Sequence, residues 1–303
     1  MIGWTKYFED YLAHMKLEKN LSDNTSAAYI HDLELLAGFI HSNYGIPPEE
    51  VEVQHIEAFM SDLYDRKVSR TTQARVLSGV KSFFNFLVIN DVINSLPTEL
   101  IDSPKTGRKL PDVLTVGETQ QIIESVDLSH PQGHRNRAIL ETLYSCGLRV
   151  SELTELRLTD IFLDDGFLRV IGKGDKQRLV PLNNELKRVM KIYLDQRRTL
   201  PVDAKHKEFV FLNNKGKKLS RVMIFLIIKD TAAAAGITKQ VSPHTFRHSF
   251  ATHLIQGGAD IRVVQEMLGH ESIMTTEIYT HLNKEYLKDS VAEHHPLNKM
   301  TRS

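Results

Sequence analysis

The sequence predicts a mainly α-helical protein with a small β-sheet, an α+β fold in two parts. Apolar residues recur at helical spacing through the first hundred residues. An aperiodic stretch with two prolines and a glycine, residues 102–111, predicts an interdomain linker. Two β-rich segments flank a polar turn at 172–176 that contains two glycines, which is typical of a β-hairpin. We therefore expect a helical bundle over 1–101 and a mixed domain over 112–303.

The first domain is predicted to be a small bundle of helices. Ser22 suits the N-cap of its longest helix, and the pair Pro47-Pro48 interrupts the helical pattern. The apolar periodicity predicts helices over Trp4 to Met15, Ser22 to Ile40, Val53 to Leu63 and Ser69 to Leu87.

The second domain is predicted to combine helices with the hairpin. The strands are expected at 167–171 and 178–182. A helix, a turn at Gly257-Gly258 and another helix are expected between Thr245 and Leu268. Further helices are predicted at about 116–126, 134–146, 150–157, 183–197 and 220–235.

Composition describes a globular protein with an uneven charge distribution. The 303 residues contain 38 Lys+Arg and 38 Asp+Glu, so the formal net charge is zero. Residues 1–105 nevertheless carry a charge of −6 and residues 106–303 a charge of +6, which makes the second part the better polyanion binder. Cys146 is the single cysteine, so no internal disulfide can form. No apolar run is long enough for a bilayer and the start lacks a signal-peptide pattern, so we expect a cytoplasmic protein.

The segment from Pro243 to His248 combines groups that bind anions. His244 and Arg247 are three residues apart and share one face of a helix, and Pro243 suits the helix start, where backbone N–H groups favour anions. The simpler alternative is a capping histidine and a surface arginine. A metal site formed by His244 and His248 is a second alternative, although Arg247 would repel a cation and the glutamate of the H-E-x-x-H pattern is absent. We expect His253 to be a packing or capping residue.

Four segments, taken in order, carry a resemblance to a known family. The segment from Pro243 to Leu254 resembles the H-x-x-R box of tyrosine site-specific recombinases, the phage-integrase family, and that from Leu268 to His281 resembles the tyrosine segment of their Xer subgroup. Residues 143–153 resemble the first arginine box, and residues 172–178 resemble the lysine hairpin. The N-terminal bundle is similar to the family's core-binding domain, so the resemblance covers most of the chain.

The resemblance implies a DNA strand-exchange enzyme in which Tyr279 attacks the scissile phosphate and forms a 3′-phosphotyrosine. Lys173 would protonate the departing 5′-oxygen. A phenol is a poor nucleophile at neutral pH but a good leaving group, so the reverse reaction needs no ATP.

The remaining catalytic residues implied by the resemblance hold the phosphate. Arg149 and Arg247 would clamp its non-bridging oxygens, His244 would act as acid or base, and His270 would donate a hydrogen bond. With these charges no metal ion or other cofactor is required. Glu152 matches an acidic family position, and we expect it to orient Arg149.

The resemblance also implies a clamp around double-stranded DNA. Groove or phosphate contacts are expected from the fourth helix and from the hairpin, through Arg70, Thr71, Thr72, Arg75, Lys176 and Arg178. The tail after Tyr279, with Leu282, Tyr286, Leu287 and Val291, would pack on a neighbouring subunit of a tetramer, or dock on its own domain.

The expected activity is resolution of chromosome or plasmid dimers, in the cytoplasm, with a related partner recombinase and a DNA translocase. An integrase of a phage or mobile element is the alternative within the family. The chain begins directly at the helical bundle, which disfavours that integrase because no segment remains for an arm-binding domain. A DNA-binding regulator without catalysis is an alternative of another class, disfavoured by the intact catalytic set, and a metal-dependent hydrolase is the third.

Overall fold

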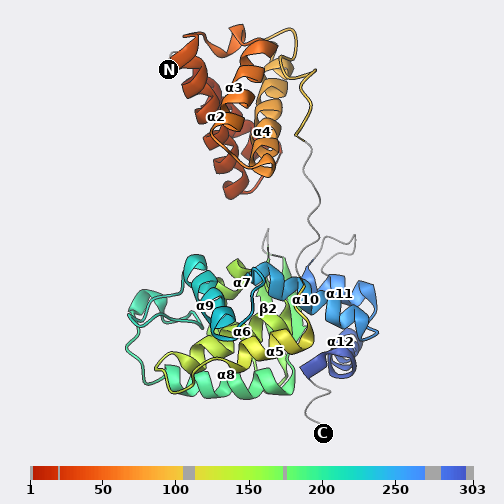
Figure 1. The fold of residues 1–303 in the computed structure, drawn as a ribbon. Helices are drawn as coiled ribbons and strands as arrows, with labels where there is room; N and C mark the ends of the chain where they lie inside the picture. The colour runs from red at the N-terminus through yellow and green to blue at the C-terminus, as the bar shows by residue number, and fades with distance from the viewer. Residues whose placement is uncertain (1–2, 20, 105–112, 173–175, 270–280, 298–303) are drawn as a thin grey trace. The chain divides into compact units, whose positions relative to one another are not determined.

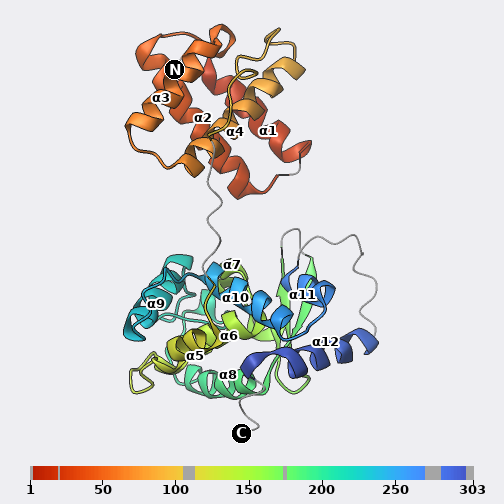
Figure 2. The same cartoon turned by 45° about the vertical axis from the view of Figure 1, so that its right-hand side comes forward.

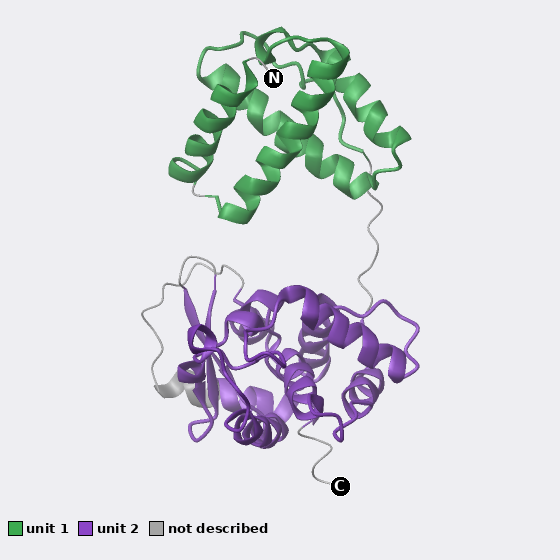
Figure 3. Cartoon of the chain, turned by 90° about the vertical axis from the view of Figure 1, so that its left-hand side faces the viewer, with its two compact units in different colours: residues 1–109 green, residues 110–303 purple. Residues whose placement is uncertain are grey.

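The chain divides into two compact units, Met1–Lys109 and Leu110–Ser303 (Figure 3). The computed structural model describes residues 3–19, 21–104, 113–172, 176–269 and 281–297, and only the backbone of 281–286. The division falls within the predicted linker 102–111, part of which lies outside the described residues. The exact domain bounds inferred from the sequence stay a prediction.

The first unit is built from helices, as predicted (Figure 1). Ser22 caps its longest helix, where its side chain accepts a hydrogen bond from the Thr25 backbone N–H. Ser69 caps the last helix in the same way, through Thr72. The helices are α1 (Trp4–Leu17), α2 (Asp23–Asn43), α3 (Val53–Asp65) and α4 (Arg70–Ile89), with a 3-10 turn at Pro48–Glu50.

Aromatic side chains fill the centre of this unit. Trp4 and Phe83 are both buried, and their rings stack with centroids 6.1 Å apart. Tyr11 packs edge-on against Phe83 and donates its hydroxyl to Ser82 at 2.7 Å. These contacts tie α1 to the C-terminal half of α4.

The second unit combines helices with a small sheet, which lies beside α11 and α12 (Figure 2). Within the described residues the strands form a three-stranded antiparallel sheet in the order β1-β2-β3. The hairpin strands are β2 (Phe167–Ile171) and β3 (Gln177–Pro181), as the sequence predicts, and β1 (Ile161–Phe162) was not predicted. The helices are α5 (Val116–Glu124), α6 (Gly133–Cys146), α7 (Val150–Glu155), α8 (Asn184–Arg197), α9 (Arg221–Ala234), α10 (Pro243–Gln256), α11 (Ile261–Leu268) and α12 (His281–His294), with 3-10 turns at Leu158–Asp160 and Ala204–His206.

Helix α6 forms the centre of the second unit and packs against both α8 and α10. Helix α12 packs on β3 and α10 of its own domain, where Leu287 and Val291 are buried. Leu287 and Val291 of the tail therefore contact their own domain in this single chain, and packing on a neighbouring subunit stays a prediction. None of the helices in the described residues is long and apolar enough to cross a bilayer.

The end of this tail is held by a buried histidine. His295 is fully buried, and the centroid of its ring lies 5.0 Å from that of the Tyr144 ring and 5.9 Å from that of the Phe250 ring. Burial lowers the pKa of His295 to about 4, against an ordinary value of 6.5. The folded protein therefore favours the neutral imidazole, whereas the unfolded chain takes up a proton below about pH 6.5.

Stability of the second unit is expected to fall as the pH drops through this window. Between pH 7.5 and pH 5, His295 should lower the free energy of unfolding by about 2 kcal/mol. His295→Phe removes the titrating group and should make the thermal midpoint less dependent on pH, whereas His130→Gln at an exposed position should not. An unchanged pH dependence in His295→Phe would show that another group controls this transition.

Candidate active site

The candidate site begins where α6 ends. Gly147 takes a left-handed conformation, with φ of +59°, and terminates the helix. A Cβ at this position would lie 2.4 Å from the Phe250 ring on α10, so no larger residue fits. The glycine therefore brings α6 and α10 into close contact and directs the chain to Arg149, the residue before α7.

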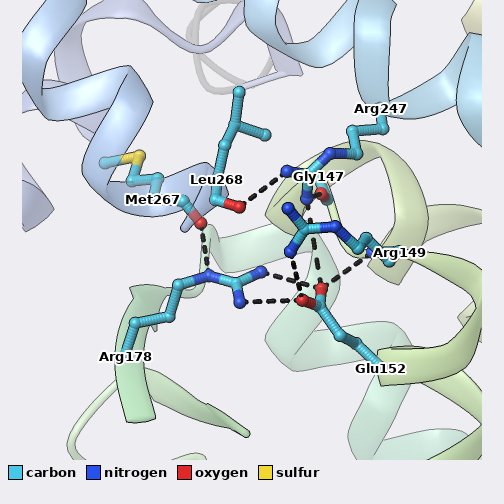
Figure 4. Close-up of polar contacts among 7 residues, drawn as sticks. All are labelled: Gly147, Arg149, Glu152, Arg178, Arg247, Met267 and Leu268. Atoms are coloured by element: carbon cyan, nitrogen blue, oxygen red, sulfur yellow. Dashed lines mark hydrogen bonds and ion pairs between the residues drawn. The ribbon is translucent and has the colours of Figure 1, made fainter. Parts of the chain in front are cut away.

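A single carboxylate organises the residues that follow. Glu152 accepts hydrogen bonds from the Arg149 backbone N–H at 2.8 Å and from Arg149 Nη1 at 2.9 Å (Figure 4). Its two oxygens also receive a bidentate pair from Arg178, with Nη1 at 2.9 Å and Nη2 at 2.8 Å. The carboxylate is buried, whereas the Arg149 side chain stays 43% exposed. This geometry agrees with the expectation that Glu152 orients Arg149.

Arg247 reaches the same place from α10. Ser242 caps this helix and Pro243 is its first residue, as predicted. The Arg247 guanidinium donates from Nη1 to the Gly147 carbonyl at 2.7 Å, 100 residues away in sequence. The same nitrogen lies 4.0 Å from Glu152 Oε2. Arg149 and Arg247 therefore face one carboxylate from two distant segments.

The C-terminal end of α11 completes the described part of the site. The last carbonyls of a helix have no partner within the helix, and they carry partial negative charge. Arg247 Nη2 donates to the Leu268 carbonyl at 2.6 Å, and Arg178 Nε donates to the Met267 carbonyl at 2.7 Å (Figure 4). Two arginines thus fix the helix that leads, in sequence, to His270 and Tyr279.

The charges of the site favour an anion. Arg149, Arg178 and Arg247 surround one carboxylate, so two positive charges remain in excess. Burial, and then repulsion from Arg149, lower the pKa of Arg247 to about 10. Burial raises the pKa of Glu152, but the hydrogen bonds and charge of Arg178, together with the hydrogen bonds from Arg149, outweigh burial, and the net pKa is lowered. A phosphate bound beside Arg149 and Arg247 would offset the repulsion between them.

The other predicted catalytic residues are placed only in part. His244 is exposed and lies one turn before Arg247 on α10. Lys173, His270 and Tyr279 lie outside the described residues. Their roles stay predictions.

The predicted DNA contacts on α4 occupy its N-terminal turns. Arg70 and Thr71 are exposed, and the Thr72 hydroxyl lies 2.8 Å from that of the N-cap Ser69. Arg75 is 45% exposed and forms an ion pair with Asp32, which is fully buried. This part of α4 is accessible to a ligand, and its contact with DNA stays a prediction.

The structure corrects the expectation that Arg178 contacts a phosphate. Its register opposite Val170, which is buried, turns its side chain toward the core. The residue is 6% exposed and all three guanidinium nitrogens donate to Glu152 or Met267. Lys176, just before β3, is exposed, and its predicted contact stays open.

Two further residues pack in the core of the second unit. His253 is buried, with its Nδ1 2.9 Å from the Tyr144 hydroxyl, so it packs in the core as expected. Cys146 is fully buried, and burial raises the pKa of its thiol, which fits a core residue. Sequence reasoning missed the role of Gly147, which its place inside the first arginine box, directly after the helix predicted over 134–146, could have indicated.

Comparison with protein families identifies the class of protein. Residues 112–286 match the phage integrase family, and residues 8–90 match the phage integrase N-terminal SAM-like domain. A tyrosine recombinase XerD of Chlorobaculum tepidum is 43% identical over 97% of both chains. The chain belongs to the phage integrase family and is a tyrosine recombinase, an enzyme that cuts and rejoins DNA at specific sites.

Solved structures share the fold. The post-cleavage complex of the XerH site-specific recombinase bound to palindromic difH substrate gives a TM-score of 0.71 at 25% identity, covering 94% of this chain and 83% of that one. A lambda integrase tetramer bound to a Holliday junction gives a TM-score of 0.69 at 17% identity, covering 92% of this chain and 80% of that one. At this identity the similarity shows a shared fold alone.

Proposed function

We propose that this recombinase cuts DNA with Tyr279 as nucleophile and a phosphate held by Arg149 and Arg247. The observation that carries the proposal is that these two guanidinium groups, from distant segments, meet at the Glu152 carboxylate. Both are fixed by the protein before a ligand binds, through Glu152 and the Gly147 and Leu268 carbonyls. Donors fixed in advance suit the negative charge that develops on a five-coordinate phosphorus.

The proposed step is a transesterification that conserves bond energy. The Tyr279 oxygen forms a bond to phosphorus, the bond from phosphorus to the 5′-oxygen breaks, and the DNA keeps its 3′-phosphate on the tyrosine. His244 accepts the phenolic proton, directly or through the phosphate, and Lys173 gives a proton to the 5′-oxygen. His270 donates a hydrogen bond to the phosphate. A 5′-hydroxyl from another strand reverses the step, so no ATP is needed, and the arginines supply the positive charge that a metal ion would otherwise provide.

DNA would be held by both units. Arg70, Thr71, Thr72 and Arg75 on α4 are the proposed contacts of the first unit, and Lys176 is that of the hairpin. The related solved complexes, one with a recombination site and one with a Holliday junction, support assembly as a homo- or heterotetramer on two duplexes.

We further propose that the cellular role is resolution of chromosome or plasmid dimers in the cytoplasm, with a related recombinase and a DNA translocase. Similarity to a recombinase named XerD over nearly the full chain supports this role over that of a mobile-element integrase. The proposed catalytic set disfavours a regulator without catalysis.

The test is formation of a covalent protein–DNA adduct in the presence of chelator. A duplex selected from a random pool by its affinity for this protein would be nicked, so that the released fragment diffuses away and cleavage becomes irreversible. We expect an adduct on denaturing gels in excess EDTA. Loss of the adduct in EDTA, with its return on addition of Mg²⁺ or Zn²⁺, would favour the metal-dependent alternative. Binding without any adduct, with or without metal, would favour the regulator.

A further inference from the structure

In the described part of the site, Arg178 is the arginine whose three guanidinium nitrogens all donate hydrogen bonds within the protein. Its two terminal nitrogens pair with both oxygens of Glu152, and its Nε donates to the Met267 carbonyl at 2.7 Å (Figure 4). The residue is 6% exposed. A side chain in this position is shielded from DNA, so any effect on the reaction must come through its contacts within the protein.

Arg178 and its two partners belong to three elements that are each close in sequence to a proposed catalytic residue. Arg178 itself is on β3, directly after the turn that contains Lys173. Glu152 is on α7 and holds Arg149. Met267 is near the end of α11, three residues before His270 and twelve before Tyr279.

We propose that Arg178 is a positioning residue that joins the hairpin, α7 and the end of α11 at one guanidinium. The inference rests on the proposed function, since it assigns to Arg178 the alignment of the groups proposed to act on the phosphate. Arg178 fixes the position of the Glu152 carboxylate, which in turn orients Arg149. It also fixes the position of β3, the strand that follows Lys173. Lysine cannot replace it, because one ammonium cannot donate to both carboxylate oxygens and to a carbonyl in the geometry of a planar fork.

The test is Arg178→Lys, which keeps a positive charge beside Glu152 and so avoids an unpaired buried carboxylate. Equilibrium binding to the selected duplex and the rate of adduct formation at saturating protein would be measured separately. We expect the dissociation constant to stay within about twofold and the saturating rate to fall about 100-fold, as misplacement of catalytic groups by an ångström can cause. The dependence of binding on salt should not change, because no phosphate contact is lost.

Arg169→Lys is the matched control. Arg169 is on the neighbouring strand β2 and also pairs with a buried carboxylate, that of Asp160, with Nε at 2.9 Å and Nη2 at 2.8 Å from Oδ1. We expect this variant to keep its saturating rate within about threefold, because lysine can still pair with one oxygen. Thermal midpoints of both variants would show whether stability changes equally.

Several results would overturn the proposal. A higher dissociation constant with a normal saturating rate would make Arg178 a phosphate contact after all. Equal losses of rate in Arg178→Lys and Arg169→Lys would indicate a general packing role, and an unchanged rate would show no positioning at all. Failure of the proposed function is recognised separately, as the absence of any adduct from the unaltered enzyme, and would remove the basis of this inference too.

Discussion

Tyr279→Phe is expected to lose covalent adduct formation by at least about 10⁴-fold, the order of loss when a nucleophile is removed from an enzyme that works through a covalent intermediate. The substitution removes one oxygen and leaves the aromatic ring. Binding to the selected duplex should therefore stay within about twofold. Denaturing gels with end-labelled DNA measure the first quantity and gel-shift titration the second.

Tyr286→Phe is the matched control, since it removes the same hydroxyl from a tyrosine seven residues later in the tail. It should form adduct at the rate of the unaltered enzyme. If Tyr279→Phe kept its adduct and Tyr286→Phe lost it, the nucleophile would be Tyr286. An adduct that survives both changes would remove both tyrosines from this role.

Arg247→Lys is expected to lower the saturating rate of cleavage by about 10³-fold. Arg247 faces Glu152 and also donates to the Gly147 and Leu268 carbonyls. Lysine keeps the charge but offers a single nitrogen, so it cannot hold both carbonyls and grip a phosphate oxygen. Loss of a fixed donor to a developing negative charge costs about 10²–10³-fold, and loss of an arginine at a transferring phosphate can cost more. Single-turnover kinetics at saturating enzyme measures this rate.

Arg137→Lys serves as its control. Arg137 is 20% exposed, is in the same domain on α6, and pairs with Glu185 on α8. This variant should keep its rate within about twofold. If Arg247→Lys bound DNA more weakly but cleaved normally once saturated, Arg247 would contribute to binding and not to the transition state.

Much of the fold could be predicted because local patterns and tertiary packing agree. Ser22 caps its helix as the sequence predicts, the helix predicted from Ser69 begins at Arg70, and the glycine-containing turn joins two antiparallel strands. Strand β1 was missed because Ile161–Phe162 is too short for alternation to be visible. Helix 150–157 ends early, at Glu155, where the chain becomes extended at Leu156.

The site residues could be predicted only in part from the sequence. Arg149, His244 and Arg247 can be proposed from motifs. The same reasoning predicts that Arg178 contacts DNA, because a basic residue in a hairpin is commonly on the surface, whereas the structure buries it. Arg178 is two residues before Val180 on the same strand, so the two side chains lie on the same face of the sheet. Val180 is apolar and 0% exposed, and this spacing was the available signal that Arg178 faces the core. That its charge can be buried depends on Glu152, 26 residues earlier in sequence, and no local pattern records such a pairing.

The most direct measurement maps the nucleotide in the adduct to a peptide. Trypsin should release residues 263–284, which contain a single tyrosine, Tyr279. After nuclease treatment, mass spectrometry is expected to find a nucleotide 3′-phosphate on that peptide, with fragment ions that place it on the tyrosine. A nucleotide on any other peptide, or one joined through a 5′-phosphate, would contradict the proposal that this phenolic oxygen attacks a phosphate gripped by Arg149 and Arg247.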